Sequence, residues 1–165
     1  MDTRESAGGP SRSAARRILI AEAPSALPDL LDSLHGLAEL VPVGSLDEAL
    51  AEMRRGVDLV VTGLHFDDIR MIDLLADAKR DPALRHVPFL CLRELDPGVP
   101  RPWLDSLRVV CAELGATRFL DGLELRASIG SPGSRERVRS LVHELLRDAG
   151  PDAAADARAG VKSRA

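Results

Sequence analysis

Short apolar runs alternate with longer stretches of helical periodicity along the chain. Five such runs occur, and each is bounded by charged or turn-forming residues: 18–21, 40–43, 57–61, 87–92 and 116–120. The run 57–61 is rich in β-branched residues, which is typical of a central strand covered on both faces. A strand of this kind delivers the residues that follow it, Thr62 and Gly63, to the crevice where open α/β sheets bind ligands.

The stretches between these runs place apolar residues at helical spacing. They predict helices after Ser25, after a capping box at 45–48, from about Asp68 to Arg80, after Pro102, and behind a final cap at Ser134. The glycine- and serine-rich residues 130–133 are interpreted as a linker. Five alternating strands and helices predict an α/β protein with a flavodoxin-like (βα)5 three-layer sandwich, whose parallel five-stranded sheet has the order 2-1-3-4-5.

Length and composition indicate one domain over residues 16–148, with disordered tails over 1–15 and 149–165. The net charge of −4, with three Phe, one Trp and no Tyr, argues against nucleic acid as a partner. The apolar runs are too short to span a membrane, so we expect a cytoplasmic protein. The two cysteines, Cys91 and Cys111, lack CxxC spacing and are expected to be buried, reduced thiols.

Four of the predicted strands resemble those of the receiver domains of two-component response regulators. The segments are RILIAEA, VDLVVTGLHFDDIRMIDLL, HVPFLCLR and GATRFLDGLE, which are similar to the first, third, fourth and fifth strands of that family. The resemblance covers about residues 16–148. It implies an acidic pair that holds magnesium on the first strand, a phospho-accepting aspartate on the third, a hydroxyl residue on the fourth and a lysine followed by proline on the fifth.

Carried over position by position, this active site is largely absent. Glu22 keeps one acidic side chain, but Ala23 stands where its partner is expected. Gly63 occupies the phospho-acceptor position, Arg93 replaces the hydroxyl residue, and Gly122 replaces the lysine. Aspartyl phosphorylation needs a carboxylate nucleophile, a divalent cation and charges that neutralise the phosphoryl oxygens. The resemblance therefore implies a degenerate phosphorylation pocket with no catalytic residue, no metal and no cofactor.

Neighbouring groups leave two alternatives open at this pocket. Asp67 or Asp68 could line the crevice with Glu22 as a weak cation site, although capping of the following helix by one of them is favoured. Arg93 could pair with Glu22 across the pocket or extend into solvent.

Two further polar residues lie near the end of the central strand. Thr62 is expected to face away from Gly63 because side chains alternate along a strand. His65 has no spaced nucleophile or acid with which to form a triad, so we interpret it as an exposed loop histidine.

The resemblance implies a stand-alone receiver-like module of bacterial two-component signal transduction. Such a module would act by protein–protein interaction without aspartyl phosphorylation, and it would not be an enzyme. The expected partner is a signalling protein, such as a histidine kinase or an output protein, and a homodimer remains open. The partner surface would be the fourth helix, fifth strand and fifth helix, with Trp103 as an anchor unless it is a partly buried core residue. The alternative is a small-ligand-binding protein or enzyme that uses the crevice around Glu22, Gly63 and Asp67.

Overall fold

The protein forms a parallel sheet of five strands in the order β2-β1-β3-β4-β5. The computed structural model describes residues 15–96 and 98–150. The strands are β1 (Arg17–Ala21), β2 (Glu39–Val43), β3 (Leu59–Gly63), β4 (Phe89–Arg93) and β5 (Arg118–Asp121). This topology confirms the predicted flavodoxin-like fold. The predicted disordered tails lie almost entirely outside the described residues.

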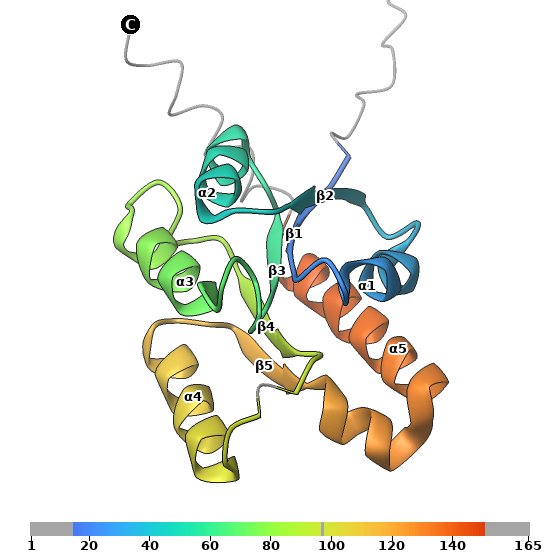
Figure 1. The fold of residues 1–165 in the computed structure, drawn as a ribbon. Coiled ribbons are helices and arrows are strands. Elements are labelled where there is room, and N and C mark those ends of the chain that lie inside the picture. The colour runs from blue at the N-terminus through green and yellow to red at the C-terminus, as the bar shows by residue number, and fades with distance from the viewer. Residues whose placement is uncertain (1–14, 97, 151–165) are drawn as a thin grey trace, which may run out of the picture.

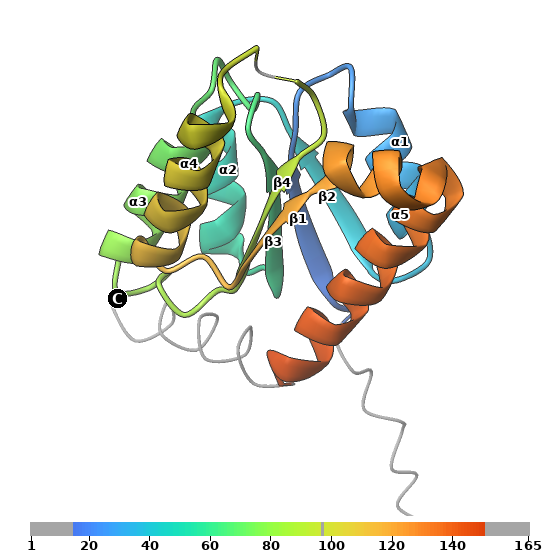
Figure 2. The same cartoon turned by 90° about the horizontal axis from the view of Figure 1, so that it is seen from below.

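Helices cover both faces of the sheet. They are α1 (Leu27–Leu34), α2 (Leu46–Arg55), α3 (Met71–Arg80), α4 (Arg101–Glu113) and α5 (Gly122–Asp148). Figure 2 shows α2, α3 and α4 on one side of the sheet and α1 and α5 on the other. Among the described residues, no helix is both long and apolar enough to cross a membrane.

The sheet separates two apolar clusters, and strand alternation decides which side chain enters which cluster. On β1, Leu19 and Ala21 pack on the side of α2 and α3, whereas Ile18 and Ile20 pack on the side of α1 and α5. Every residue of β3 is buried, as expected for a central strand. The same alternation determines the direction of the residues at the strand ends, where the candidate site lies.

Two local predictions around α2 and β2 are confirmed. The Ser45 hydroxyl accepts a hydrogen bond from the Glu48 backbone N–H at 3.3 Å, so the predicted cap is present. Pro42 lies on β2, which is an edge strand, where a missing backbone donor is tolerated.

The start of α3 differs from the prediction. Asp67, Asp68 and Ile69 have φ values of 43°, 56° and 66°, so the helix begins at Met71 and not at Asp68. Neither aspartate caps α3. The Asp67 carboxylate accepts a hydrogen bond from the Leu46 backbone N–H at 2.8 Å and thus caps the neighbouring helix α2.

The start of α1 also differs, because the position before its first turn is Ala26 and no side chain caps it. The predicted cap at Ser25 is therefore wrong. Pro28 lies in the first turn, where a missing N–H group has no intrahelical partner to lose.

The fifth helix is longer than predicted and bent (Figure 1). It begins directly at Gly122, where the Asp121 carboxylate accepts a hydrogen bond from the Glu124 backbone N–H at 3.0 Å. At Gly130, φ is 76° and ψ is 169°, so the helix breaks there and resumes at Ser131. The predicted linker is therefore a kink of one residue. Ser134 is a buried residue inside the second segment and not a cap.

Candidate functional site

Four residues lie at or just beyond the C-terminal ends of the strands, in line with the side chains that face α1 and α5. Glu22 follows Ile20 by two residues on the chain, Gly63 follows Val61, Glu94 follows Leu92 and Gly122 follows Leu120. All four preceding residues belong to the cluster beneath α1 and α5. Because side chains alternate along a strand, the four residues lie at one edge of the sheet on its α1 and α5 side.

The side chain of Glu22 fills the space beside Gly63. A Cβ atom at Gly63 would overlap with both carboxyl oxygens and the Cδ atom of Glu22. Glu22 is only 4% exposed, and its Oε1 accepts a hydrogen bond from the Ala23 backbone N–H at 2.7 Å. Its Oε2 is buried and has no hydrogen-bond partner in the described part of the chain. The absence of a side chain at residue 63 is what makes room for this carboxyl group.

Burial raises the pKa of Glu22 from 4.5 to about 7. Desolvation is the main cause, because removal from water penalises the charged carboxylate. The hydrogen bond from the Ala23 N–H opposes this shift, and the charge of Glu94 adds to it. A carboxyl group with this pKa exchanges a proton near neutral pH.

A second carboxylate repeats the arrangement on the neighbouring pair of strands. A Cβ atom at Gly122 would overlap with the carboxyl group of Glu94. Arg126 of α5 donates hydrogen bonds to Glu94 through both terminal nitrogens, one to Oε2 and one to the backbone carbonyl at 2.6 Å. Unlike Glu22, Glu94 is therefore neutralised by a cation.

Arg93 lies on the opposite face of the sheet from Glu22. Its guanidinium pairs with Asp121, the residue next to it in register on β5. Burial acts to raise the pKa of Asp121, but the Glu124 backbone N–H and the guanidiniums of Arg93 and Arg108 outweigh it, so the pKa lies below its usual value. The suggested Arg93–Glu22 pair is therefore wrong, because Arg93 alternates with the residue before it and points toward α4.

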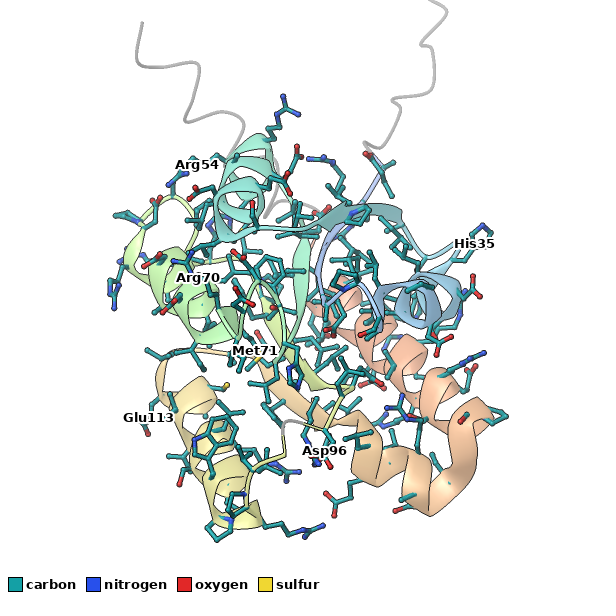
Figure 3. The ribbon with its side chains drawn as sticks, in the orientation of Figure 1. His35, Arg54, Arg70, Met71, Asp96 and Glu113 are labelled. Carbon is teal, nitrogen blue, oxygen red and sulfur yellow. The ribbon has the colours of Figure 1, made fainter. Side chains whose placement is uncertain are left out.

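The other polar candidates do not join Glu22. Thr62 is fully buried on the face opposite Gly63, as predicted from alternation, and its hydroxyl has no hydrogen-bond partner in the described residues. His65 is half-buried, not exposed, and its Nε2 likewise has no partner there. Asp67 is committed to the cap of α2. His35 lies beyond α1 at the outer edge of the molecule (Figure 3).

A metal centre is not apparent at this edge. Within residues 15–96 and 98–150, no group of three or more His, Cys, Asp or Glu side chains is placed to hold a metal ion. Of the residues that the structure describes, Glu22 and Glu94 bring carboxyl groups to the α1 and α5 side of this edge, and Arg126 already forms an ion pair with Glu94. The geometry supports a filled, mostly desolvated pocket.

Solved structures of known proteins have a fold similar to that of this chain. The receiver domain of a signal transduction histidine kinase from Syntrophus aciditrophicus is 25% identical in sequence, with 81% of this chain and 92% of that chain covered and a TM-score of 0.60. The phosphorylated cyanobacterial phytochrome response regulator RcpA is 19% identical, with 83% and 98% covered and a TM-score of 0.64.

The fold is that of a receiver domain. A CheY-like receiver domain protein from Methanospirillum hungatei JF-1 extends the likeness, at 16% identity, with 82% of this chain and 97% of that chain covered and a TM-score of 0.62. No family model matches the sequence, and no curated protein matches it significantly. The receiver likeness is thus carried by structure and not by a sequence motif.

Glu94 is the site residue that sequence reasoning missed. The resemblance aligned Arg93 with the hydroxyl residue at the end of the fourth strand. Leu92 lies in the cluster beneath α1 and α5. Because side chains alternate along a strand, Glu94 lies on the same side of the sheet as Leu92 and Gly63.

Proposed function

We propose that this protein is a pseudo-receiver, a signalling module that keeps the receiver fold and acts through protein contacts without aspartyl phosphorylation. The observation that supports it is the Glu22 carboxyl group, which occupies the space beside Gly63. Gly63 aligns with the phospho-accepting aspartate of receiver domains, and a glycine has no nucleophile.

The surroundings of Gly63 support the same conclusion. Phosphoryl transfer to a carboxylate needs a bound divalent cation and positive groups around the phosphoryl oxygens. Here Glu22 fills the space beside Gly63, and Glu94 fills the space beside Gly122 and is paired with Arg126. A phosphoryl group would have to displace the buried carboxyl side chain of Glu22 before it could bind beside Gly63.

The fourth helix carries the partner surface in this proposal. Three large apolar side chains on α4 are exposed: Trp103 at 42%, Val109 at 61% and Val110 at 42%. Arg108 of the same helix forms ion pairs with Asp121 and with Glu124 of α5, which fixes α4 against the adjacent elements. Exposed apolar residues held on a rigid helix are typical of interaction surfaces, and Trp is enriched at interface hot spots.

Capture from an extract of the source organism tests the proposal. The full chain is used as bait, with and without magnesium and acetyl phosphate. We expect the same partner in both conditions, because no phosphorylated state is needed. Trp103→Ala should weaken capture by at least about tenfold, since truncation of a hot spot costs about 2 kcal/mol or more.

Ile69→Ala is the matched control, because Ile69 is 54% exposed but precedes α3. Capture by this variant should equal that of the unchanged chain. A partner bound only after acetyl phosphate treatment, or lost equally in both variants, would contradict the proposal.

A further inference from the structure

The two cysteines of the chain meet between β4 and α4. Cys91 is on β4 and Cys111 is in the last turn of α4, and both are free thiols that are fully buried. They belong to the same apolar cluster, on the side of the sheet that α2, α3 and α4 cover. The Cys91 thiol donates a hydrogen bond to the sulfur atom of Cys111, so the two sulfur atoms are direct neighbours.

Polar and charged neighbours distinguish this pair from thiols in a purely apolar core. In the register of the sheet, Thr62 of β3 lies next to Cys91, and its buried hydroxyl has no hydrogen-bond partner in the described residues. Buried polar groups nearly always have a partner. The hydroxyl is therefore a donor that can stabilise charge on the neighbouring sulfur. The charge of Lys79 on α3 also acts on Cys91 and favours its thiolate form.

The two thiols differ in acidity. The hydrogen bond from Cys91 lowers the pKa of Cys111, although burial acts in the opposite direction. The same hydrogen bond, together with burial, raises the pKa of Cys91. The thiolate is the nucleophile in thiol chemistry. Cys111 is therefore the sulfur that attacks an oxidant, and Cys91 is the thiol that reacts in the second step.

Cys111 is also the sulfur that an oxidant reaches more easily. The next two residues, Ala112 and Glu113, are exposed, and α4 ends there. Helix ends open locally at a small cost in free energy. Hydrogen peroxide is small enough to enter through such an opening. Cys91, in contrast, lies on a strand that is paired on both sides.

We propose that Cys91 and Cys111 form a reversible disulfide when the protein meets a peroxide, and that this bond moves α4. The Cys111 thiolate attacks one oxygen of hydrogen peroxide, and the O–O bond breaks. Cys111 becomes a sulfenic acid, and the other oxygen leaves as hydroxide, which takes up the proton released by Cys111. The Cys91 sulfur then attacks the Cys111 sulfur, and the sulfenic oxygen leaves as water with the Cys91 proton. Two thiols are oxidised and one peroxide is reduced to two water molecules.

The disulfide draws α4 toward the sheet. An S–S bond of about 2.05 Å is shorter than the contact between two hydrogen-bonded sulfur atoms. Because β4 is held between β3 and β5, α4 makes most of the movement. Trp103 is on the same helix and reports this movement. The disulfide itself is independent of the proposed function, whereas an effect of α4 on partner capture rests on it.

Intact mass measurement of the folded full chain after treatment with hydrogen peroxide tests this pair. We expect a loss of two hydrogen atoms per chain, which dithiothreitol reverses by thiol–disulfide exchange. Trypsin cleaves after arginine, so Cys91 lies in the peptide 86–93 and Cys111 in the peptide 109–118. The two peptides should be joined only after oxidation. The emission of Trp103, the single tryptophan of the chain, should shift on oxidation and return with dithiothreitol.

Cys91→Ala and Cys111→Ala are the matched variants, because alanine keeps each buried position apolar. Neither variant should lose hydrogen or shift its Trp103 emission, and urea denaturation verifies that each is folded. Cys91→Ala should instead gain oxygen on the peptide 109–118, because Cys111 then lacks the second thiol.

The unchanged chain decides the proposal even where a variant does not fold. No loss of hydrogen after peroxide treatment, or a disulfide between two chains, would overturn the redox pair. A disulfide within the chain that leaves the Trp103 emission unchanged would overturn the movement of α4. None of these measurements uses a partner, so their failure is distinct from a failure of the proposed function.

Discussion

Two glutamates lie over two glycines at the carboxyl edge of the sheet. Glu22 fills the space beside Gly63, and Glu94 fills the space beside Gly122. The two carboxyls have different environments. Arg126 neutralises Glu94, whereas within the described residues the Ala23 N–H is the one donor to Glu22. Burial without a cation is what raises the pKa of Glu22 to about 7.

The pKa of Glu22 predicts a pH-dependent stability. Because this pKa is 4.5 in an unfolded chain and about 7 in the folded protein, the folded state binds more protons between these values. The free energy of unfolding therefore falls as pH rises through this window. A shift of this size changes the free energy of unfolding by about 3 kcal/mol across the window.

Urea denaturation of the unchanged chain and of Glu22→Gln, from about pH 5 to about pH 8, measures this contribution. The unchanged chain should lose stability relative to the variant as pH rises, because glutamine does not titrate. Parallel curves for the two proteins would show that Glu22 is ordinarily ionised when folded.

The fit between Glu22 and Gly63 predicts a strong coupling between the two positions. Gly63→Ala should lower the free energy of unfolding by about 1–3 kcal/mol, because the new methyl group overlaps with the Glu22 carboxyl group. In a Glu22→Ala background, Gly63→Ala should lower the free energy of unfolding by at least about 1 kcal/mol less than it does in the unchanged chain.

Gly44→Ala serves as the control, because a Cβ atom there meets only Glu48 Oε2 at the ordinary contact distance of 3.7 Å. Its effect should stay within about 0.5 kcal/mol. Additive effects of the Glu22 and Gly63 substitutions would show that the two residues do not share this space.

At the scale of elements, the segment between β3 and α3 is the most strained part of the described backbone. Asp67, Asp68 and Ile69 are consecutive non-glycine residues with positive φ. The Asp67 bond to the N-terminus of α2 holds this segment in place. Met71, which follows it, is fully buried and anchors the start of α3 under the sheet (Figure 3).

Ile69→Gly should therefore stabilise the protein by about 0.5–1 kcal/mol. A β-branched residue pays a steric cost in the left-handed region that glycine avoids, and Ile69 loses little packing because it is 54% exposed. Thermal or urea denaturation measures the change.

Ile129→Gly is the matched control, since Ile129 is 53% exposed but lies in the helical first segment of α5. This substitution should destabilise by about 0.5–1 kcal/mol, because glycine weakens a helix. Destabilisation of similar size by both variants would show that the loop backbone is not strained.

At the scale of the whole molecule, the hydrophobic pattern alone was sufficient to predict the sheet. Five apolar runs became five strands in the predicted order, because a parallel sheet with crossover helices leaves few alternatives. The helix α5 begins at Gly122 and not behind the predicted cap at Ser134, although Asp121 followed by Glu124 is a helix-start signal in the sequence. The glycines and serines behind it concealed that signal, since a kink and a linker share the same composition.

The contents of the pocket were harder to predict than the fold. The identities of Gly63 and Gly122 were visible in the sequence, but their neighbours Glu22 and Glu94 occupy that space only through tertiary packing. The suggested pair between Arg93 and Glu22 fails because successive side chains of a strand point to opposite faces, and Arg93 pairs with Asp121 on the face opposite Glu22.

Intact mass measurement after incubation with magnesium and acetyl phosphate tests the central claim most directly. The unchanged chain should keep its mass, because no aspartate stands beside Glu22 at the end of β3 and the space is filled. A stoichiometric gain of one acid-labile phosphoryl group per chain would contradict the account.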